Sequence, residues 1–343
     1  MKHIVGFFLP LCIFCFVAFG ISVAVLGTTP IADSENITVN DTTTFIDEDF
    51  HRIELDSELV SVKIYPTNGN KTIIRTTKSQ MDSISYSVSG GTLKLYFERN
   101  IKDFWDIFHT FTGVFGQSVE IYVPDKQYDN IIATVDAGST EINGVKFANV
   151  DLELNAGSLV FANPEGYLNS SLNVELNAGN CAVYNANTQR FDIAMSAGNI
   201  DVYGLTGSGY LEVSAGNGVF NFDKLNGDIS IDASAGNAEL NIPENSSAIV
   251  YCDKTAGNVT VKYNGSNNSL HNDEDYIIGE GRYAINANIS AGNISITDKT
   301  VQKTAPTVMT APTTNTTNGG VVTTAVHTTN SSAYIDPVES KAE

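Results

Sequence analysis

Five acidic residues lie at spacings that could bring carboxylates together for chemistry on a sugar chain. They are Glu153, Glu175, Glu212, Asp232 and Asp253. An enzyme that cleaves polysaccharides on a β-helix needs such acids clustered on one sheet face, with a basic group nearby. Lys254 is the only basic residue among the apolar repeat positions described below. We therefore favour a solvated acidic surface and keep a polysaccharide-cleaving enzyme as an alternative.

A second polar cluster, His271, Asp273, Glu274 and Asp275, lies within the segment 263–282. Oxygen-rich loops can bind calcium, but this one lacks the regular ligand spacing of a calcium loop, so we expect a solvated loop. None of the five histidines falls at a regular position of the repeat, and the chain contains no His or Cys set at metal-ligand spacing. The sequence therefore predicts no catalytic residue, no metal site and no cofactor.

The net charge bounds the partners of the chain. Its formal value is −20 over 343 residues. Nucleic acids and anionic lipid surfaces both need basic patches, so we expect neither to bind. A small-molecule substrate is not expected either, because no catalytic set is present.

The elements that carry these residues form an internal repeat around Ala-Gly followed by Ser or Asn. Successive glycines are 18 to 22 residues apart, except for a final gap of 35. The eight glycines are Gly138, Gly157, Gly179, Gly198, Gly216, Gly236, Gly257 and Gly292. Residues three and five before each glycine, and four after it, are apolar except Lys254, and the residue four before each glycine is mostly polar. Each unit is therefore predicted to be a strand, a bend and a second strand.

Units of this length cannot bury their apolar faces alone, so they must stack. The sequence predicts an all-β fold, a single-stranded parallel β-solenoid (β-helix) of about eight rungs over residues 125–298. We expect each glycine to adopt a backbone angle, or to make a close approach, that a Cβ atom would prevent. The asparagines that follow are interpreted as a structural ladder at these corners rather than a ligand site. They are Asn180, Asn199, Asn217, Asn237, Asn258 and Asn293.

Two cysteines lie in the repeat body. Cys181 and Cys252 both occupy inward phases, and four rungs of about 4.8 Å would separate them by roughly 19 Å. A disulfide tolerates a Cα separation of only about 7 Å. The sequence therefore predicts two buried, unpaired thiols.

The N-terminal segment 1–27 is predicted to be an uncleaved transmembrane helix. Residues from Ile4 to Leu26 carry no charge, which is long enough to cross a bilayer core of roughly 30 Å. Lys2 precedes the run and the next basic residue is Arg52, so the positive-inside rule places the N-terminus in the cytoplasm and the rest outside. A cleaved signal peptide is the alternative. Residues 28–44 read as a linker.

Residues 45–124 alternate with period two and are predicted to form a β-rich N-terminal cap. An aromatic insert at 100–116 interrupts this pattern. Its large side chains recur every three or four residues, which is typical of a short amphipathic helix. The insert either covers the end of the stack or contacts a membrane or partner. The interaction candidates are Phe104, Trp105, Phe108 and Phe111. Residues 299–343 are Thr-rich without periodicity and are predicted to be a disordered tail.

The strand 60–64, the strand 119–124 ending in Pro124, and the Ala-Gly-Asn series resemble the bacterial putative-adhesin family, whose domains have unknown function. The resemblance covers residues 45–298 and implies repeated Gly-Asn or Gly-Asp β-helix rungs and adhesion. It supplies no catalytic residues. We therefore expect a non-enzymatic, membrane-anchored cell-surface protein that binds a surface protein or glycan. An accessory ectodomain in envelope-stress signalling is the alternative that the resemblance also implies.

Overall fold

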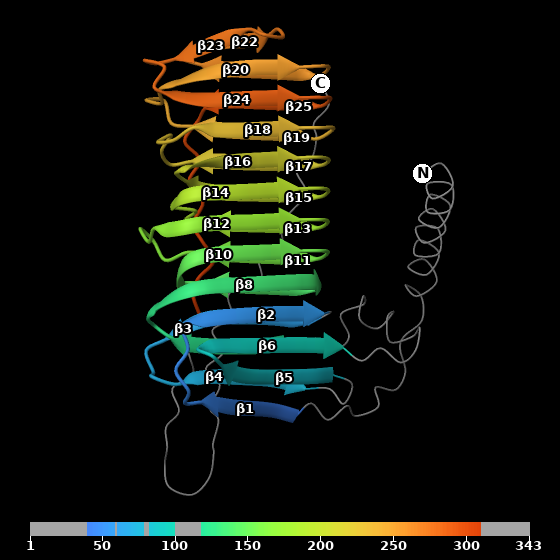
Figure 1. The fold of residues 1–343 in the computed structure, drawn as a ribbon, viewed down its shortest axis with the longest axis vertical. Coiled ribbons are helices and arrows are strands. Elements are labelled where there is room, and N and C mark those ends of the chain that lie inside the picture. Colours follow the sequence, from blue (N-terminus) through green and yellow to red (C-terminus); the bar gives the residue numbers. More distant parts are fainter. Residues whose placement is uncertain (1–39, 59, 79–81, 100–117, 310–343) are drawn as a thin grey trace, which may run out of the picture. The chain divides into compact units, whose positions relative to one another are not determined.

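The computed structural model describes residues 40–58, 60–78, 82–99 and 118–309 (Figure 1). The predicted transmembrane segment, the aromatic insert and the end of the tail lie outside these residues. Within the described ranges, no helix is long and apolar enough to cross a membrane.

The described chain is all-β and forms two large sheets that stack strand upon strand (Figure 1). The 13-stranded sheet, called sheet A here, has the order β1 (Asn40–Ile46), β4 (Thr72–Lys78), β7 (Ser118–Pro124), β3 (Ser61–Thr67), β9 (Ser139–Asn143), β11 (Ser158–Ala162), β13 (Asn180–Tyr184), β15 (Asn199–Leu205), β17 (Asn217–Phe222), β19 (Asn237–Ile242), β25 (Asn293–Asp298), β21 (Asn258–Tyr263) and β22 (Ser266–Leu270). The 12-stranded sheet, sheet B, has the order β23 (Asp275–Ile278), β20 (Ala248–Lys254), β24 (Tyr283–Ile289), β18 (Ile229–Ala233), β16 (Ser208–Val213), β14 (Thr188–Met195), β12 (Asn169–Leu176), β10 (Lys146–Leu154), β8 (Gln127–Ala137), β2 (Arg52–Glu58), β6 (Thr92–Arg99) and β5 (Asp82–Ser89).

Each Ala-Gly corner joins a strand of sheet B to a strand of sheet A, and strands of successive units pair in parallel. The apolar repeat positions face one another between the sheets. Leu152, Leu154 and Phe161, from a single unit, are each 0% exposed. The parallel solenoid that the repeat predicts is therefore present, and its core is the space between the two sheets.

The corner glycines stack directly on one another. Gly198 has a φ of 105°, and a Cβ added there would lie 2.1 Å from the carbonyl oxygen of Gly179. The amide of Asn199 donates to the same oxygen at 2.9 Å, so the corner is held by a backbone hydrogen bond that leaves no space for a side chain. Gly236 differs, because its φ is not positive, although a Cβ there would still meet Val213 at 2.5 Å.

The last repeat does not stack in sequence order. β24 and β25 insert between the pair β18 and β19 and the pair β20 and β21. The segment 263–282, predicted to be a solvated loop, contains two strands. β22 pairs antiparallel with β21, and β23 pairs antiparallel with β20. These strands cover the outer edges of the last rung, so the final repeat finds a partner only further inside the stack.

The N-terminal region is rich in strands, as predicted, and these strands continue the two sheets of the stack. β2 and β3 pair in parallel with β8 and β9, and β6 and β7 pair in parallel beneath them. Antiparallel pairs at this end of the described chain join β1 to β4, β4 to β7, and β5 to β6. β1 begins at Asn40, so residues 40–44 of the predicted linker belong to the sheet.

The first part of the predicted disordered tail has a defined position in the structure. Residues 299–309 are described, and several of them contact the outer face of sheet A. We call this segment the strap. Its contacts explain why a Thr-rich sequence without periodicity can hold one position.

Candidate interaction face on sheet B

The five acids singled out in the sequence fall in one row on the outer face of sheet B, the face turned away from the core. The register aligns Glu153 with Glu175, Glu212 with Asp232, and Asp253 with the same row through Asn288. Ala194 completes the row between Glu175 and Glu212. Among the described residues, this row contains no lysine or arginine. The acids therefore form a surface stripe that is uninterrupted by a basic side chain within the described strands.

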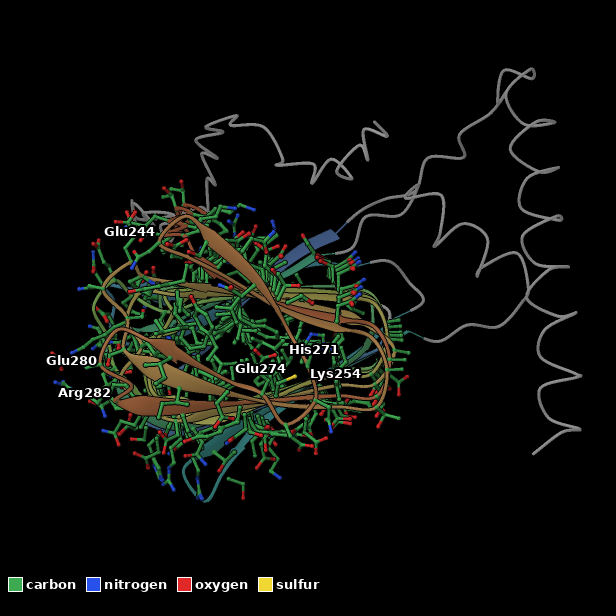
Figure 2. All side chains as sticks on the ribbon, turned by 90° about the horizontal axis from the view of Figure 1, so that it is seen from above. Glu244, Lys254, His271, Glu274, Glu280 and Arg282 are labelled. Carbon is green, nitrogen blue, oxygen red and sulfur yellow. The ribbon has the colours of Figure 1, made fainter. Side chains whose placement is uncertain are left out.

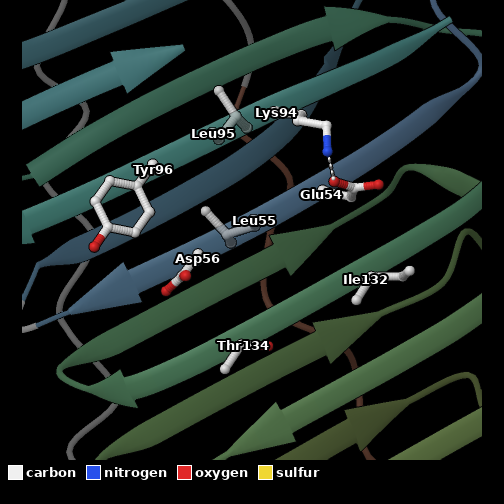
Figure 3. A pocket seen from close by; sticks show the side chains of 8 residues that line it. All are labelled: Glu54, Leu55, Asp56, Lys94, Leu95, Tyr96, Ile132 and Thr134. Atoms are coloured by element: carbon white, nitrogen blue, oxygen red, sulfur yellow. Dashed lines mark ion pairs between the residues drawn. The ribbon is translucent and has the colours of Figure 1, made fainter. Parts of the chain in front are cut away.

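A hollow of about 330 Å³ opens at the N-terminal end of this row, over β6, β2 and β8 (Figure 3). Six outward side chains line it in two registered rows of three. One row is Lys94, Glu54 and Ile132, and the other is Tyr96, Asp56 and Thr134. Adjacent strands lie about 4.8 Å apart and alternate residues about 6.6 Å apart, so the grid measures roughly 10 by 7 Å. Leu55 and Leu95 line the hollow between the two rows, while their side chains are buried in the core on the opposite face of the sheet.

Both charged and apolar groups line the hollow. Lys94 Nζ lies 2.7 Å from Glu54 Oε2, an ion pair visible as a dashed line in Figure 3. Tyr96 and Ile132 are 37% and 43% exposed, so both offer apolar surface at the hollow. Burial, and then the nearby charge of Asp136, raises the pKa of the Asp56 carboxyl above its ordinary value.

This arrangement offers a ring face, an aliphatic surface, two carboxylates, an ammonium and a hydroxyl within one small area. Such a set can hold a ligand by apolar contact on one side and by hydrogen bonds around its edge. Thr134 is followed in the register by Glu153, so the hollow continues directly into the acidic row. The face therefore presents one short apolar platform and a long line of hydrogen-bond acceptors.

The structure brings the six repeat asparagines together in a single row along the corners. Five side-chain hydrogen bonds join them, each from the Nδ2 of one asparagine to the Oδ1 of its neighbour, at distances of 2.7 to 3.2 Å. The row runs Asn180, Asn199, Asn217, Asn237, Asn293 and Asn258, which follows the spatial order of the strands and not the order in the chain. Their amides are occupied by one another.

The polar cluster at the other end of the stack closes that end. Figure 2 shows Lys254, His271 and Glu274 grouped together, apart from Glu280 and Arg282. Lys254 Nζ donates to the carbonyl of Leu270 at 2.5 Å, and the amide of His271 donates to Glu274 Oε2 at 2.7 Å. Among the described residues, no group of three or more His, Cys, Asp or Glu side chains could hold a metal ion.

The two body cysteines are buried and unpaired, as predicted. Each is 3% exposed. Burial raises the pKa of the Cys181 thiol to about 12 and also raises that of Cys252. Neither thiol is therefore a nucleophile near neutral pH.

Sequence reasoning missed the hollow, because its residues come from three strands that are far apart in the chain. One signal was available. Ile132 and Tyr96 are large apolar residues at positions where the alternation calls for polar ones, next to the inward residues Ile131 and Phe97. The aromatic candidates Phe104, Trp105, Phe108 and Phe111 lie outside the described residues.

A family model described as Toastrack DUF4097 matches residues 50–297. Among solved structures, a putative cell adhesion protein from Clostridium sporogenes is 14% identical and covers 76% of this chain and 100% of its own, with a TM-score of 0.25. A putative adhesin from Bacteroides fragilis is 14% identical over 76% and 98% of the two chains, with a TM-score of 0.36. No curated protein matches the chain. Similarity at these levels carries no inference about what this chain binds.

Proposed function

The chain belongs to the Toastrack DUF4097 family, which confirms the resemblance to domains of unknown function, and on this premise we propose that it is a non-enzymatic, membrane-anchored surface protein that binds a glycan on sheet B. The hollow over β6, β2 and β8 carries the proposal. It is a hollow on the outer face of the solenoid that combines an exposed ring with polar groups of both charges.

A sugar ring has a CH face and an edge of hydroxyl groups. The CH face suits the exposed ring of Tyr96 and the side chain of Ile132, because both offer apolar surface. Hydroxyl groups can donate to the carboxylates of Glu54 and Asp56 and accept from Lys94. The grid of roughly 10 by 7 Å accommodates one such ring with its substituents.

The acidic row extends the site. Successive strands of sheet B are about 4.8 Å apart, so carboxylates such as Glu153 and Glu175 offer acceptors at regular intervals beyond the hollow. An oligosaccharide lying along the row would make hydrogen bonds on several rungs.

Anchoring is the second part of the proposal and rests on the sequence. The uncharged run Ile4–Leu26 would span the membrane once, with Lys2 on the cytoplasmic side and the solenoid outside the cell. Residues 28–39 would then connect the membrane segment to β1.

Binding of the full-length chain in detergent micelles to a panel of neutral and N-acetylated oligosaccharides tests the proposal. Removing the ring in Tyr96→Ala should cost about 1.5 kcal/mol or more of binding free energy, which weakens the best ligand at least tenfold. Tyr251→Ala is the matched control, because Tyr251 is 40% exposed on the same sheet but belongs to β20. Absence of saccharide binding, or equal affinities for the two variants, would refute the proposed site.

A further inference from the structure

The strap, residues 299–309, crosses the strands of sheet A on their outer face. It begins where the amide of Lys299 donates to the carbonyl of Ile242 at 3.0 Å. Further along, Asn143 Nδ2 donates to the carbonyl of Pro306 at 2.9 Å. Five strand spacings separate β19, which carries Ile242, from β9, or about 24 Å, and the seven steps from residue 299 to residue 306 span at most about 23–25 Å. The strap is therefore almost fully extended.

At the centre of the strap, Lys303 interacts with an aromatic and an acidic residue of β15. Lys303 Nζ lies 5.2 Å from the ring centroid of Tyr203, within the range of a cation–π contact. The same ammonium attracts the half-buried carboxylate of Asp201. Tyr184 stacks on Tyr203 with centroids 5.3 Å apart, which fixes the ring that receives the lysine.

The next residues of the strap meet surfaces of matching size. Ala305 packs against a cluster formed by Ala162, Ala182 and Tyr184, whose small side chains leave space for the strap. Val308 lies over Gly144, where an added Cβ would come within 2.8 Å of Val308 Cγ2. Lys303, Ala305 and Val308 thus each contact different residues along sheet A.

The strap is held mainly through side chains. Among the described residues, no backbone–backbone hydrogen bond joins residues 300–309 to sheet A, whereas Lys299 is bound in this way. The segment is therefore attached as a short linear motif, Lys-Thr-Ala-Pro-Thr-Val, and not as a strand of the sheet. These side-chain contacts can be lost without breaking any hydrogen bond between strands. The segment can therefore leave the outer face of sheet A while both sheets stay intact.

We propose that the outer face of sheet A is a peptide-binding channel for the segment 303–308, and that it accepts this segment from a second copy of the chain. The sequence that fits the channel is present in every copy, and exchange of an identical element is a route to dimers that needs no new interface. In a single chain the tether gives the strap a high effective concentration, so exchange needs the internal strap to be released.

Two full-length variants separate the channel from its ligand. The strap variant K303E/A305E places carboxylates beside Asp201 and the small-residue cluster, which empties the channel. The channel variant D201K/Y203A repels Lys303 and removes its ring, which frees an intact strap. We expect each variant alone to be monomeric in detergent by light scattering, and a mixture of the two to form a one-to-one complex. A mixture that remains monomeric would overturn exchange between copies.

A labelled peptide of residues 299–309 tests the channel directly. Fluorescence anisotropy should show at least tenfold tighter binding to K303E/A305E than to the wild-type chain, whose own strap competes. T304E is the matched control, because Thr304 is exposed between the two contact residues and its replacement should leave the channel closed. No binding to K303E/A305E, or equal binding to all three chains, would overturn the proposal.

Discussion

Substitution of one corner glycine should destabilise the solenoid far more than substitution of a glycine in an open turn. Gly198 and Gly265 make the comparison. Both have a positive φ, of 105° and 73°. A Cβ at Gly198 would lie 2.1 Å from the carbonyl oxygen of Gly179, whereas a Cβ at Gly265 would meet nothing within 4 Å. The pair therefore separates backbone strain from steric overlap.

The magnitude for Gly198→Ala follows from two costs. A non-glycine residue at this φ carries roughly 1–3 kcal/mol of backbone strain. Relief of the overlap must also lengthen the hydrogen bonds that Asn199 and Asn217 donate at the corner, each worth about 1 kcal/mol. We expect a total of roughly 3–5 kcal/mol. Gly265→Ala, in the Asn264–Gly265 turn between β21 and β22, should cost only about 1–2 kcal/mol.

Thermal unfolding followed by far-ultraviolet circular dichroism measures both variants. For a domain of this size 1 kcal/mol corresponds to roughly 2–4 °C, so Gly198→Ala should lower Tm by roughly 6–20 °C and Gly265→Ala by roughly 2–8 °C. Equal decreases in Tm would show that the corner relaxes without strain. That result would refute the inference that stacked glycine corners hold the rungs together.

Two further predictions concern buried titratable groups. Burial raises the pKa of Cys181 from 9.0 to about 12, so its thiolate population falls about a thousandfold near pH 8, and peptide mapping should find it unlabelled by iodoacetamide until the chain unfolds. Labelling in the folded chain would contradict its burial. Burial also raises the pKa of Asp201 above 3.8, although Lys303 acts oppositely. Folding therefore favours the protonated carboxyl, and its cost at neutral pH disappears as the pH falls through the folded pKa. D201N should raise Tm more at pH 7 than at pH 3, and an equal shift at both would contradict this sign.

The repeat positions specify the rungs but not their order. The inward residues Ile231, Ala287 and Cys252 occupy the same phase in three different units, and each is apolar and buried. By this pattern any of these units could stack on any other. Stacking in sequence order is therefore only the simplest expectation, and the alternation itself does not specify it. The order changes because β22 and β23 cover the edges of the last rung. The 35-residue gap shows that a segment is inserted there, but it does not show where that segment pairs.

The hollow and the strap depend on register, which only the folded sheets define. Glu54, Lys94 and Ile132 become neighbours because three strands pair without offset at those residues. The strap has no periodicity, and the residues that receive it, such as Ala162 and Tyr203, look like ordinary strand residues until they line up on one face. A linear pattern predicts which side of a strand faces the core, but it does not predict which outward residues meet.

Hydroxyl-radical footprinting with and without a bound oligosaccharide tests the central claim most directly. The full-length chain would be saturated with the tightest ligand of the oligosaccharide panel, and side-chain labelling would be read by mass spectrometry. The account predicts that Tyr96 and Ile132 become protected, while Tyr251 and Ile277, which are 40% and 65% exposed on β20 and β23, keep their labelling. Unchanged labelling of Tyr96 and Ile132 at saturation would contradict the assignment of the binding face to sheet B.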